Sequence, residues 1–221
     1  RLDYAVSREE AIAHARELVA ATDVPVSADL ENCFGENPAG VGETVRLALD
    51  AGLAGCSIED YNPDANGSLY DLDTAAERVA AAAQAAHGSA ERLVLTARAE
   101  NHLRGNPDLA DTIARLQAYQ QAGADVLYAP ALHRPGDIRD LLASVDLPVN
   151  VLVVPGAPPV SQLGALGVKR VSVGGAFAFV ALGAVVRAAS ELLNEGTYGF
   201  LELSGAGAKA ARAAFAPARP G

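Results

Sequence analysis

Short apolar runs alternate with helical segments along the whole chain, and this order restricts the fold more than any other feature. The expected strands are 24–32, 55–61, 93–101, 126–132, 148–154 and 170–175. Apolar residues at three- and four-residue spacing predict a helix after each strand and one before the first, where Ser7 and Glu10 match a capping box. Apolar strands separated by single helices indicate a parallel sheet covered by helices.

Two architectures contain such a sheet, a (β/α)8 barrel of the TIM type and an open doubly wound sheet. No early strand is followed by a glycine-rich dinucleotide loop, which favours the barrel. The pattern contains six strands where a barrel needs eight, and a helix stands in front of them. We therefore expect one barrel domain over 1–221, apparently without its first two strands in this sequence, and with a C-terminal helical extension.

Composition excludes several classes of function. Half of the 221 residues are hydrophobic and a fifth are charged, which is typical of a soluble globular protein. A net charge of −10 argues against a nucleic-acid partner, which requires a basic face. The two cysteines, Cys33 and Cys56, form no disulfide framework and suggest a cytoplasmic protein. The most apolar run, 176–186, is too short to span a membrane and predicts a buried helix.

Charged residues gather where the expected strands end. Asp29 and Glu31 end the first strand, Glu59 ends the second, and Arg98 and Glu100 end the third. If Asp29, Glu31 and Glu59 face the barrel mouth, three carboxylates converge and need a cation. Oxygen ligands without Cys or His favour Mg²⁺, with Mn²⁺ as a substitute. Arg98 would bind a substrate carboxylate or hold Glu100. The alternative is a set of solvated loop ends or a structural ion-pair network.

The same segments carry a family likeness. VPVSADLENCFG, GCSIEDY and LTARAEN, followed by PVNVLVVPG and GVKRVSVGG, resemble the isocitrate lyase and phosphoenolpyruvate mutase superfamily, in particular its carboxyphosphonoenolpyruvate mutase-like members. The resemblance implies that Asp29, Glu31 and Glu59 hold Mg²⁺ and that Arg98 binds the substrate. It also implies a mobile lid over 61–70 and a metal-held enolate formed from a small 2-oxo acid.

The sequence departs from this family in two places. The Lys-Lys/Arg-Cys-Gly-His loop of the isocitrate and methylisocitrate lyases does not occur, so the chain does not match the Cys-containing lyase branch. Pro130 stands at the end of the fourth expected strand, where the mutases have a His and the lyases a Glu. These departures leave the substrate open.

We therefore expect a Mg²⁺-dependent lyase or hydrolase that cleaves a C–C bond of a small 2-oxo acid, or of its adduct, through an enolate. A phosphoenolpyruvate mutase-type phosphonomutase or C–P hydrolase is the alternative, and a non-catalytic barrel subunit is a further one. Arg98 and Glu100 are the candidate catalytic residues, and Arg98, Asn150 and the lid residue Asn62 the candidate substrate-binding residues. The apolar final helix and the resemblance suggest a homodimer or homotetramer that exchanges this helix, with neither nucleic acid nor membrane as a partner.

Overall fold

The computed structural model describes residues 5–63, 65, 68–88 and 90–215, and it divides into two compact units. The first unit is Arg1–Ser172 and the second is Val173–Gly221. The first five expected strands, the start of the sixth and all but the last of the expected helices lie in the first unit.

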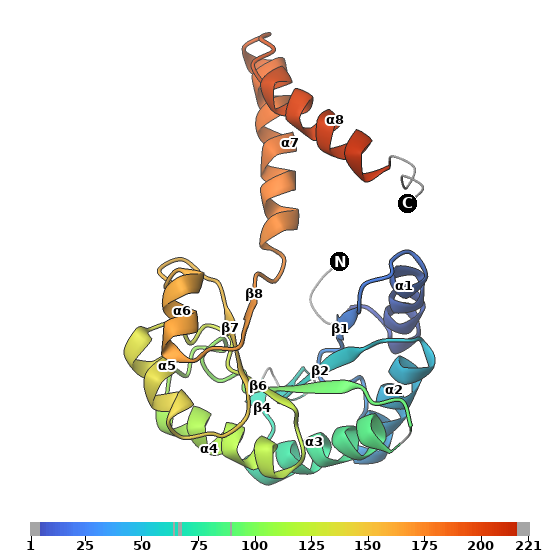
Figure 1. Cartoon of the computed structure of the whole chain (residues 1–221), viewed down its shortest axis with the longest axis vertical. Helices are drawn as coiled ribbons and strands as arrows, with labels where there is room; N and C mark the ends of the chain where they lie inside the picture. Colours follow the sequence, from blue (N-terminus) through green and yellow to red (C-terminus); the bar gives the residue numbers. More distant parts are fainter. Residues whose placement is uncertain (1–4, 64, 66–67, 89, 216–221) are drawn as a thin grey trace, which may run out of the picture. The chain divides into compact units, whose positions relative to one another are not determined.

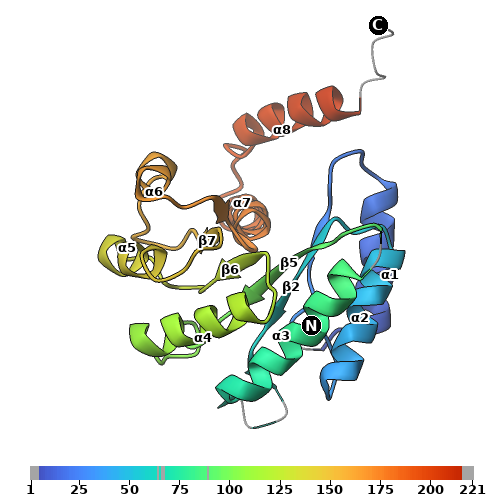
Figure 2. The ribbon, with the colours of Figure 1, turned by 60° about the horizontal axis from the view of Figure 1, so that its bottom comes forward.

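A six-stranded parallel sheet forms the first unit, with its strands in chain order (Figure 1). Its strands are β1 (Ser27–Asp29), β2 (Gly55–Glu59), β5 (Val94–Arg98), β6 (Val126–Tyr128), β7 (Val149–Leu152) and β8 (Arg170–Ser172). The sheet curls, and the helices lie along its outer side (Figure 2). This half-barrel confirms the expected barrel-type fold. The strands are shorter than predicted.

Six helices cover the sheet in this unit. They are α1 (Arg8–Ala20), α2 (Pro38–Asp50), α3 (Leu72–His87), α4 (Leu109–Gln121), α5 (Pro135–Leu142) and α6 (Val160–Leu166). The expected capping box at Ser7 is confirmed, because its side chain accepts from the Glu10 backbone while the Glu10 side chain accepts from the Ser7 backbone. Asn37, Asp71 and Asp108 cap α2, α3 and α4 in the same way, with a side-chain oxygen on a first-turn N–H.

The two faces of the sheet differ in chemistry. Residues that face the helices are apolar and almost fully buried: Cys56, Ile58, Leu95, Ala97, Leu127 and Val151. Residues that alternate with them, such as Ser57, Thr96 and Asn150, are polar and face the concave side. The hydrophobic core therefore lies between sheet and helices, and the lumen of the half-barrel is free for polar chemistry.

A small antiparallel hairpin follows β2 and corresponds to the expected lid. Its strands are β3 (Tyr61–Asn62) and β4 (Ser68–Leu69), and Tyr61 pairs with Leu69. The Tyr70 N–H donates to the carbonyl oxygen of Asp60 at 2.8 Å, so both ends of the hairpin are held at the carboxyl end of β2. Asp64, Asn66 and Gly67, also part of the expected lid, lie outside the described residues.

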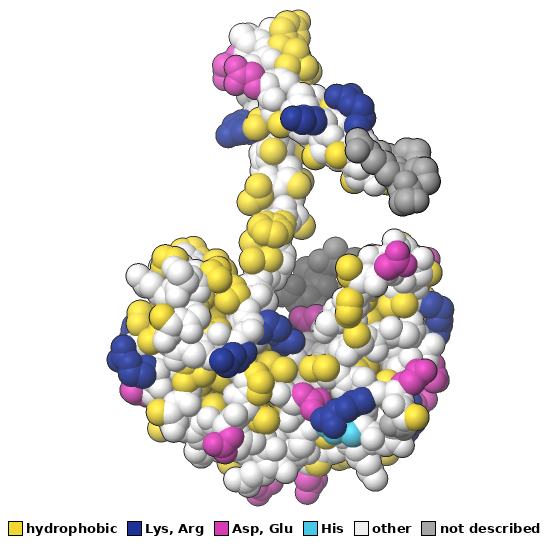
Figure 3. Space-filling model, in the orientation of Figure 1, with side chains coloured by type: hydrophobic (Ala, Val, Ile, Leu, Met, Phe, Trp, Pro, Cys, Tyr) yellow, Lys and Arg dark blue, Asp and Glu magenta, His cyan; other side chains and the backbone are white. Residues whose placement is uncertain are grey.

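The second unit contains α7 (Ala176–Asn194) and α8 (Leu201–Ala214). The sequence predicted a buried helix here, and that prediction is wrong for this chain, since no residue of α7 is buried. Apolar side chains run along its length (Figure 3), including Phe177 and Phe179, which are 75% and 72% exposed. The apolar side chains of α7 therefore form a surface that no other part of the described chain covers. The helix continues to Asn194, beyond the expected apolar run 176–186, so the prediction that it is too short to span a membrane is also wrong: by length and composition alone, α7 could cross one.

Asp125 joins three elements at the amino-terminal edge of the sheet and gives a test of the fold. Its carboxylate accepts from the Leu95 N–H and from His87 Nε2, both at 2.8 Å, and it pairs with Arg92. Burial alone would raise the pKa of Asp125, but the hydrogen bonds from Leu95 and His87 lower it.

Asp125→Ala should lower the free energy of unfolding by about 1–3 kcal/mol at pH 7, measured by urea denaturation with circular dichroism.

Because the folded-state pKa of Asp125 is depressed, its contribution is present above the unfolded-state value of about 3.9 and is lost as the pH falls through the folded-state value. The difference between the wild-type chain and Asp125→Ala should therefore shrink below about pH 4. Asp140→Ala, at an exposed position on α5, is the control. Equal denaturation midpoints for wild type and Asp125→Ala at pH 7 would contradict this account.

Candidate active site

A row of polar residues crosses five neighbouring strands at one level. The strand register pairs Glu59 with Arg98, Arg98 with Tyr128, Tyr128 with Asn150, and Asn150 with Arg170. Partners in register point to the same face of a parallel sheet, and the residues before them in sequence face the helices. The row therefore runs around the lumen from β2 to β8.

The Arg98 guanidinium joins three carboxylates. Its nitrogen atoms lie 2.6 Å from Asp29, 3.0 Å from Glu59 and 2.7 Å from Glu100. Asp29 is the last residue of β1 and Glu59 the last of β2, so one side chain connects the ends of three adjacent strands. Burial alone would lower the pKa of Arg98, but the three carboxylates raise it.

Carboxylates outnumber guanidinium groups around Arg98. The Glu59 and Glu100 side chains are only 3% and 0% exposed, and one second cation, Arg104, approaches them at 4.0 Å and 3.5 Å. Oε2 of Glu100 is buried and accepts no hydrogen bond within the described chain, and burial raises the pKa of Glu100 although Arg98 opposes this. Three carboxylates thus share two guanidinium groups, which leaves the cluster with excess negative charge.

A buried network beneath the cluster fixes the backbone of Glu100. One Asp60 oxygen accepts from the Glu100 N–H at 2.9 Å, and the other accepts from Arg115 at 3.0 Å and from the Tyr119 hydroxyl at 2.5 Å. Arg115 also donates to the Tyr70 carbonyl at 3.0 Å. Because Tyr70 closes the hairpin, the network connects the hairpin to the residues around Arg98.

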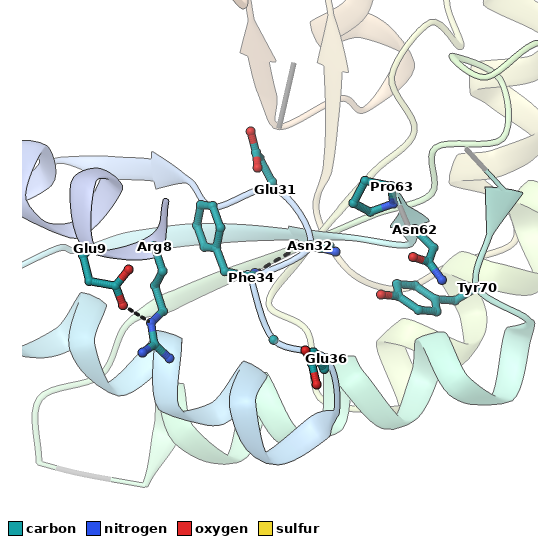
Figure 4. A pocket seen from close by; sticks show the side chains of 10 residues that line it. Arg8, Glu9, Glu31, Asn32, Phe34, Glu36, Asn62, Pro63 and Tyr70 are labelled. Carbon is teal, nitrogen blue, oxygen red and sulfur yellow. Dashed lines mark hydrogen bonds and ion pairs between the residues drawn. The ribbon is translucent and has the colours of Figure 1, made fainter. Parts of the chain in front are cut away.

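Glu31 and Asn62 line a neighbouring cavity of about 640 Å³. Glu31 and Phe34 come from the loop after β1, whereas Asn62 and Tyr70 come from the hairpin and lie on the other side (Figure 4). Glu31 has a φ of 51°, so the strand has ended before it, and its N–H donates to Asp29 at 3.1 Å. The strand alternation that was expected to place Asp29 and Glu31 on one face therefore stops at Asp29.

The described residues include no group of three or more His, Cys, Asp or Glu side chains arranged to hold a metal ion. Arg98 lies between Asp29 and Glu59. A cation in this region would take a minority of its ligands from carboxylates and the rest from water or substrate, which is the usual coordination of Mg²⁺. The assignment of Asp29, Glu31 and Glu59 as metal ligands therefore stays a prediction.

Asn150 and its neighbours form the other side of the lumen. Asn150 donates to Ser172 at 2.9 Å and accepts from Arg170 at 3.2 Å, and Arg170 also donates to Thr96 at 2.7 Å. Arg98 lies over the Tyr128 ring, 5.4 Å from its centre. The sequence did not single out Thr96, Tyr128, Arg170 or Ser172, although the two-residue alternation from Arg98 places Thr96 on the same face of its strand.

A parallel β/α half-barrel with an arginine–carboxylate cluster at the carboxyl ends of its strands places the chain among the TIM-type barrel proteins. Comparison with known families identifies the family within this class. Residues 2–193 match the family model of phosphoenolpyruvate phosphomutase. The chain belongs to this family, as the resemblance implied.

Individual relatives agree with this assignment. "Probable 2-methylisocitrate lyase 2" of Corynebacterium glutamicum is 36% identical over 145 residues, which cover 62% of this chain and 46% of that protein. A Burkholderia cenocepacia crystal structure, inferred to be a lyase or mutase, is 50% identical with a TM-score of 0.86, covering 89% of this chain and 72% of the other. Phosphonopyruvate hydrolase, crystallised with oxalate and Mg²⁺, is 25% identical with a TM-score of 0.74, covering 96% and 80%. The chain spans about half the length of its curated relatives.

Arg98→Gln tests the electrostatics of the cluster. The substitution leaves Glu59 and Glu100 buried without their main cation, so the free energy of unfolding should fall by about 3–5 kcal/mol at pH 8. Burial raises the pKa of Glu100, and Arg98 no longer opposes this in the variant, so the loss should become smaller as the pH is lowered and Glu100 takes up a proton. Chemical denaturation at pH 8 and pH 5.5 measures both effects.

Arg104→Gln is the matched control, because Arg104 is more exposed and lies farther from the same carboxylates. It should destabilise the chain less than Arg98→Gln. If the two variants lose equal stability, or if the loss in Arg98→Gln does not depend on pH, the cluster is not held together as described.

Proposed function

We propose that the chain is a Mg²⁺-dependent enzyme that cleaves a C–C bond of a small 2-oxo acid or of its adduct. The observation that carries the proposal is the Arg98 cluster, in which three carboxylates from neighbouring strand ends share a guanidinium in a polar lumen. Active sites of parallel barrels lie at this end of the strands. Family membership supports the same chemistry.

The residues present fit a hard divalent cation. The excess of carboxylate over guanidinium gives the cluster a negative charge, and its donors are oxygen atoms. Asp29, Glu31 and Glu59 would hold Mg²⁺, or Mn²⁺ in its place, together with water. When bound, the ion would supply a Lewis acid for the negative charge that develops on the 2-oxo acid as the bond breaks. The phosphonopyruvate hydrolase complex with oxalate and Mg²⁺ supports this choice of ion.

The chain's own residues would orient the substrate and move the proton. Arg98 holds Asp29, Glu59 and Glu100 in place and would contact the substrate carboxylate. Glu100 would accept a proton from the substrate at Oε2 as the bond breaks and pass it to the product carbon. Burial raises the pKa of Glu100, which favours its protonated form in this step. Asn150 would donate to a substrate oxygen, and Asn62 would close over the site with the lid.

Product analysis separates this activity from the alternatives. Cleavage of a C–C bond releases a free 2-oxo acid such as pyruvate or glyoxylate, whereas a C–P hydrolase releases inorganic phosphate and a phosphonomutase forms a rearranged phosphonate. The relationship to phosphonopyruvate hydrolase favours these as the second candidate. A non-catalytic barrel subunit would bind neither the ion nor a 2-oxo acid, and the carboxylate cluster argues against it.

We further propose that the chain is a soluble cytoplasmic homo-oligomer. The apolar side chains of α7, among them Val180 at 70% and Val185 at 65% exposure, form a surface that a second copy would cover. A homodimer or homotetramer that exchanges this helix would bury it. The lack of a basic surface patch in the sequence leaves small molecules as the expected ligands.

Sedimentation velocity without detergent tests the oligomer. The chain should sediment as a dimer or tetramer, and Val180→Glu with Val185→Glu should shift it to a monomer because a charged side chain is costly in an apolar interface. Glu195→Gln, an exposed substitution just after α7, should leave the assembly unchanged. A soluble monomeric wild-type chain, or one that needs detergent to stay in solution, would contradict the proposal.

Calorimetric titration with oxalate tests the proposed site, since oxalate mimics a 2-oxo acid in its enolate form. Oxalate should bind in the presence of Mg²⁺ and not in the presence of EDTA. Asp29→Asn and Glu59→Gln, which keep the shape of each side chain but remove its charge, should each weaken binding by at least about tenfold. Asp140→Asn on α5 is the matched control and should bind like the wild type. Metal-independent binding, or unchanged affinity in both site variants, would overturn the proposal.

A further inference from the structure

Arg170 differs from the other guanidinium groups of the lumen in the partners it contacts. Arg98 and Arg104 face carboxylates. Arg170, partly buried, instead donates from Nε to the Asn150 amide oxygen at 3.2 Å and from one terminal nitrogen to the Thr96 hydroxyl at 2.7 Å. Both partners are neutral. Charged groups that are withdrawn from water are normally paired with an opposite charge, so this arrangement requires an explanation.

The direction of the pKa shift of Arg170 also indicates that it has no acidic partner among the described residues. Burial lowers the pKa of Arg170, and the Tyr128 phenol is the group that opposes this effect. A carboxylate partner would raise the pKa of Arg170, as three carboxylates do for Arg98. Within the described chain, Arg170 therefore carries its charge without an acid to compensate it.

The curl of the sheet brings Arg170 close to the proposed site. Arg170 starts β8, at the far end of the polar row from Glu59, yet its guanidinium reaches Thr96 on β5. Thr96 lies two residues before Arg98 on the same face of that strand. Arg170 and Arg98 therefore border one lumen from opposite sides of the row.

The bonds to Asn150 and Thr96 use two of the five N–H donors of the guanidinium. None of the remaining nitrogen atoms of Arg170 is among the buried side-chain atoms of the described chain that lack a hydrogen bond. The remaining donors are therefore accessible to a ligand. Held on two sides, the planar group presents its other donors in a fixed orientation, which suits a carboxylate or a phosphonate.

We propose that Arg170 binds a second anionic group of the substrate, at the end remote from its 2-oxo acid group. This inference rests on the proposed function. Arg98 is already shared by Asp29, Glu59 and Glu100, so few of its N–H donors remain for a second anion beside the 2-oxo acid group. A substrate with negative charge at both ends therefore needs a cation elsewhere in the lumen, and Arg170 supplies it. The two sources of such a group are a carboxylate and a phosphonate.

Four probes, titrated into the full chain with Mg²⁺, test the proposal. Oxalate reports on the metal end alone. Oxaloacetate and phosphonopyruvate each add a second anionic group, and 4-methyl-2-oxopentanoate replaces the second carboxylate of oxaloacetate by an uncharged isopropyl group of similar size. Affinities are measured in the cold by displacement of oxalate, so that turnover of the probes is slow.

The wild-type chain should bind oxaloacetate or phosphonopyruvate at least about tenfold more tightly than 4-methyl-2-oxopentanoate. Arg170→Gln, whose amide nitrogen takes the position of Nε beside Asn150, should remove this preference and leave oxalate and the uncharged probe within about twofold of the wild type. Arg170→Lys keeps the charge and should restore part of the preference. The doubly charged probe that loses more affinity identifies the group as carboxylate or phosphonate.

Equal loss for all four probes in Arg170→Gln, or no loss for either doubly charged probe, would overturn the role of Arg170. If Arg170→Gln does not fold by circular dichroism, Arg170→Lys decides, since it should weaken only the doubly charged probes. Failure of wild-type oxalate binding would instead overturn the proposed function, so the two failures are distinguishable.

Discussion

One guanidinium in contact with three carboxylates is the interaction on which the carboxyl end of the half-barrel depends. Arg98 connects the ends of β1, β2 and β5 through Asp29, Glu59 and Glu100. Without a cation between them, two nearly buried acids and a third beside them would repel one another in a medium that screens charge poorly. Arg98 therefore makes an acidic pocket possible in a chain of this size, and it leaves the pocket with unbalanced negative charge that a divalent ion can use.

The polar row from Glu59 to Arg170 continues the polar lining of the lumen beyond Arg98. Each strand contributes one face to the apolar core under the helices and one face to the lumen, so stability and chemistry are separated by the pleat of the sheet. The lumen face changes in character from acid at Glu59 to an isolated cation at Arg170. A ligand with a metal-binding end and a second negative group would be complementary to that gradient. The buried Asp60–Arg115 pair beneath Glu100 connects the same site to the β3–β4 hairpin through Tyr70.

Much of this architecture could be predicted from periodicity, because apolar alternation and helix caps are local signals. The six strands and the covering helices follow from them, and the strand ends identified Arg98 and the acids that it contacts. The exact ends of the strands could not be predicted, since Glu31 at a φ of 51° and Ala131 at 68° leave the extended conformation soon after the last paired residue. Arg170 was missed because its position opposite Thr96 depends on the register and curl of the sheet. The exposure of α7 was missed because an apolar sequence does not specify what covers it.

We propose above all that Asp29 and Glu59 bind a divalent ion beside Arg98 and that a 2-oxo acid binds to this ion. The most direct measurement is a crystal structure of the chain with Mn²⁺ and oxalate, in which anomalous scattering locates the metal independently of any assumed ligands. The account predicts a single strong anomalous peak in the lumen next to Asp29 and Glu59, with oxalate between the ion and Arg98. A peak elsewhere on the chain, or an undisturbed Arg98 cluster without metal at saturating Mn²⁺, would contradict it.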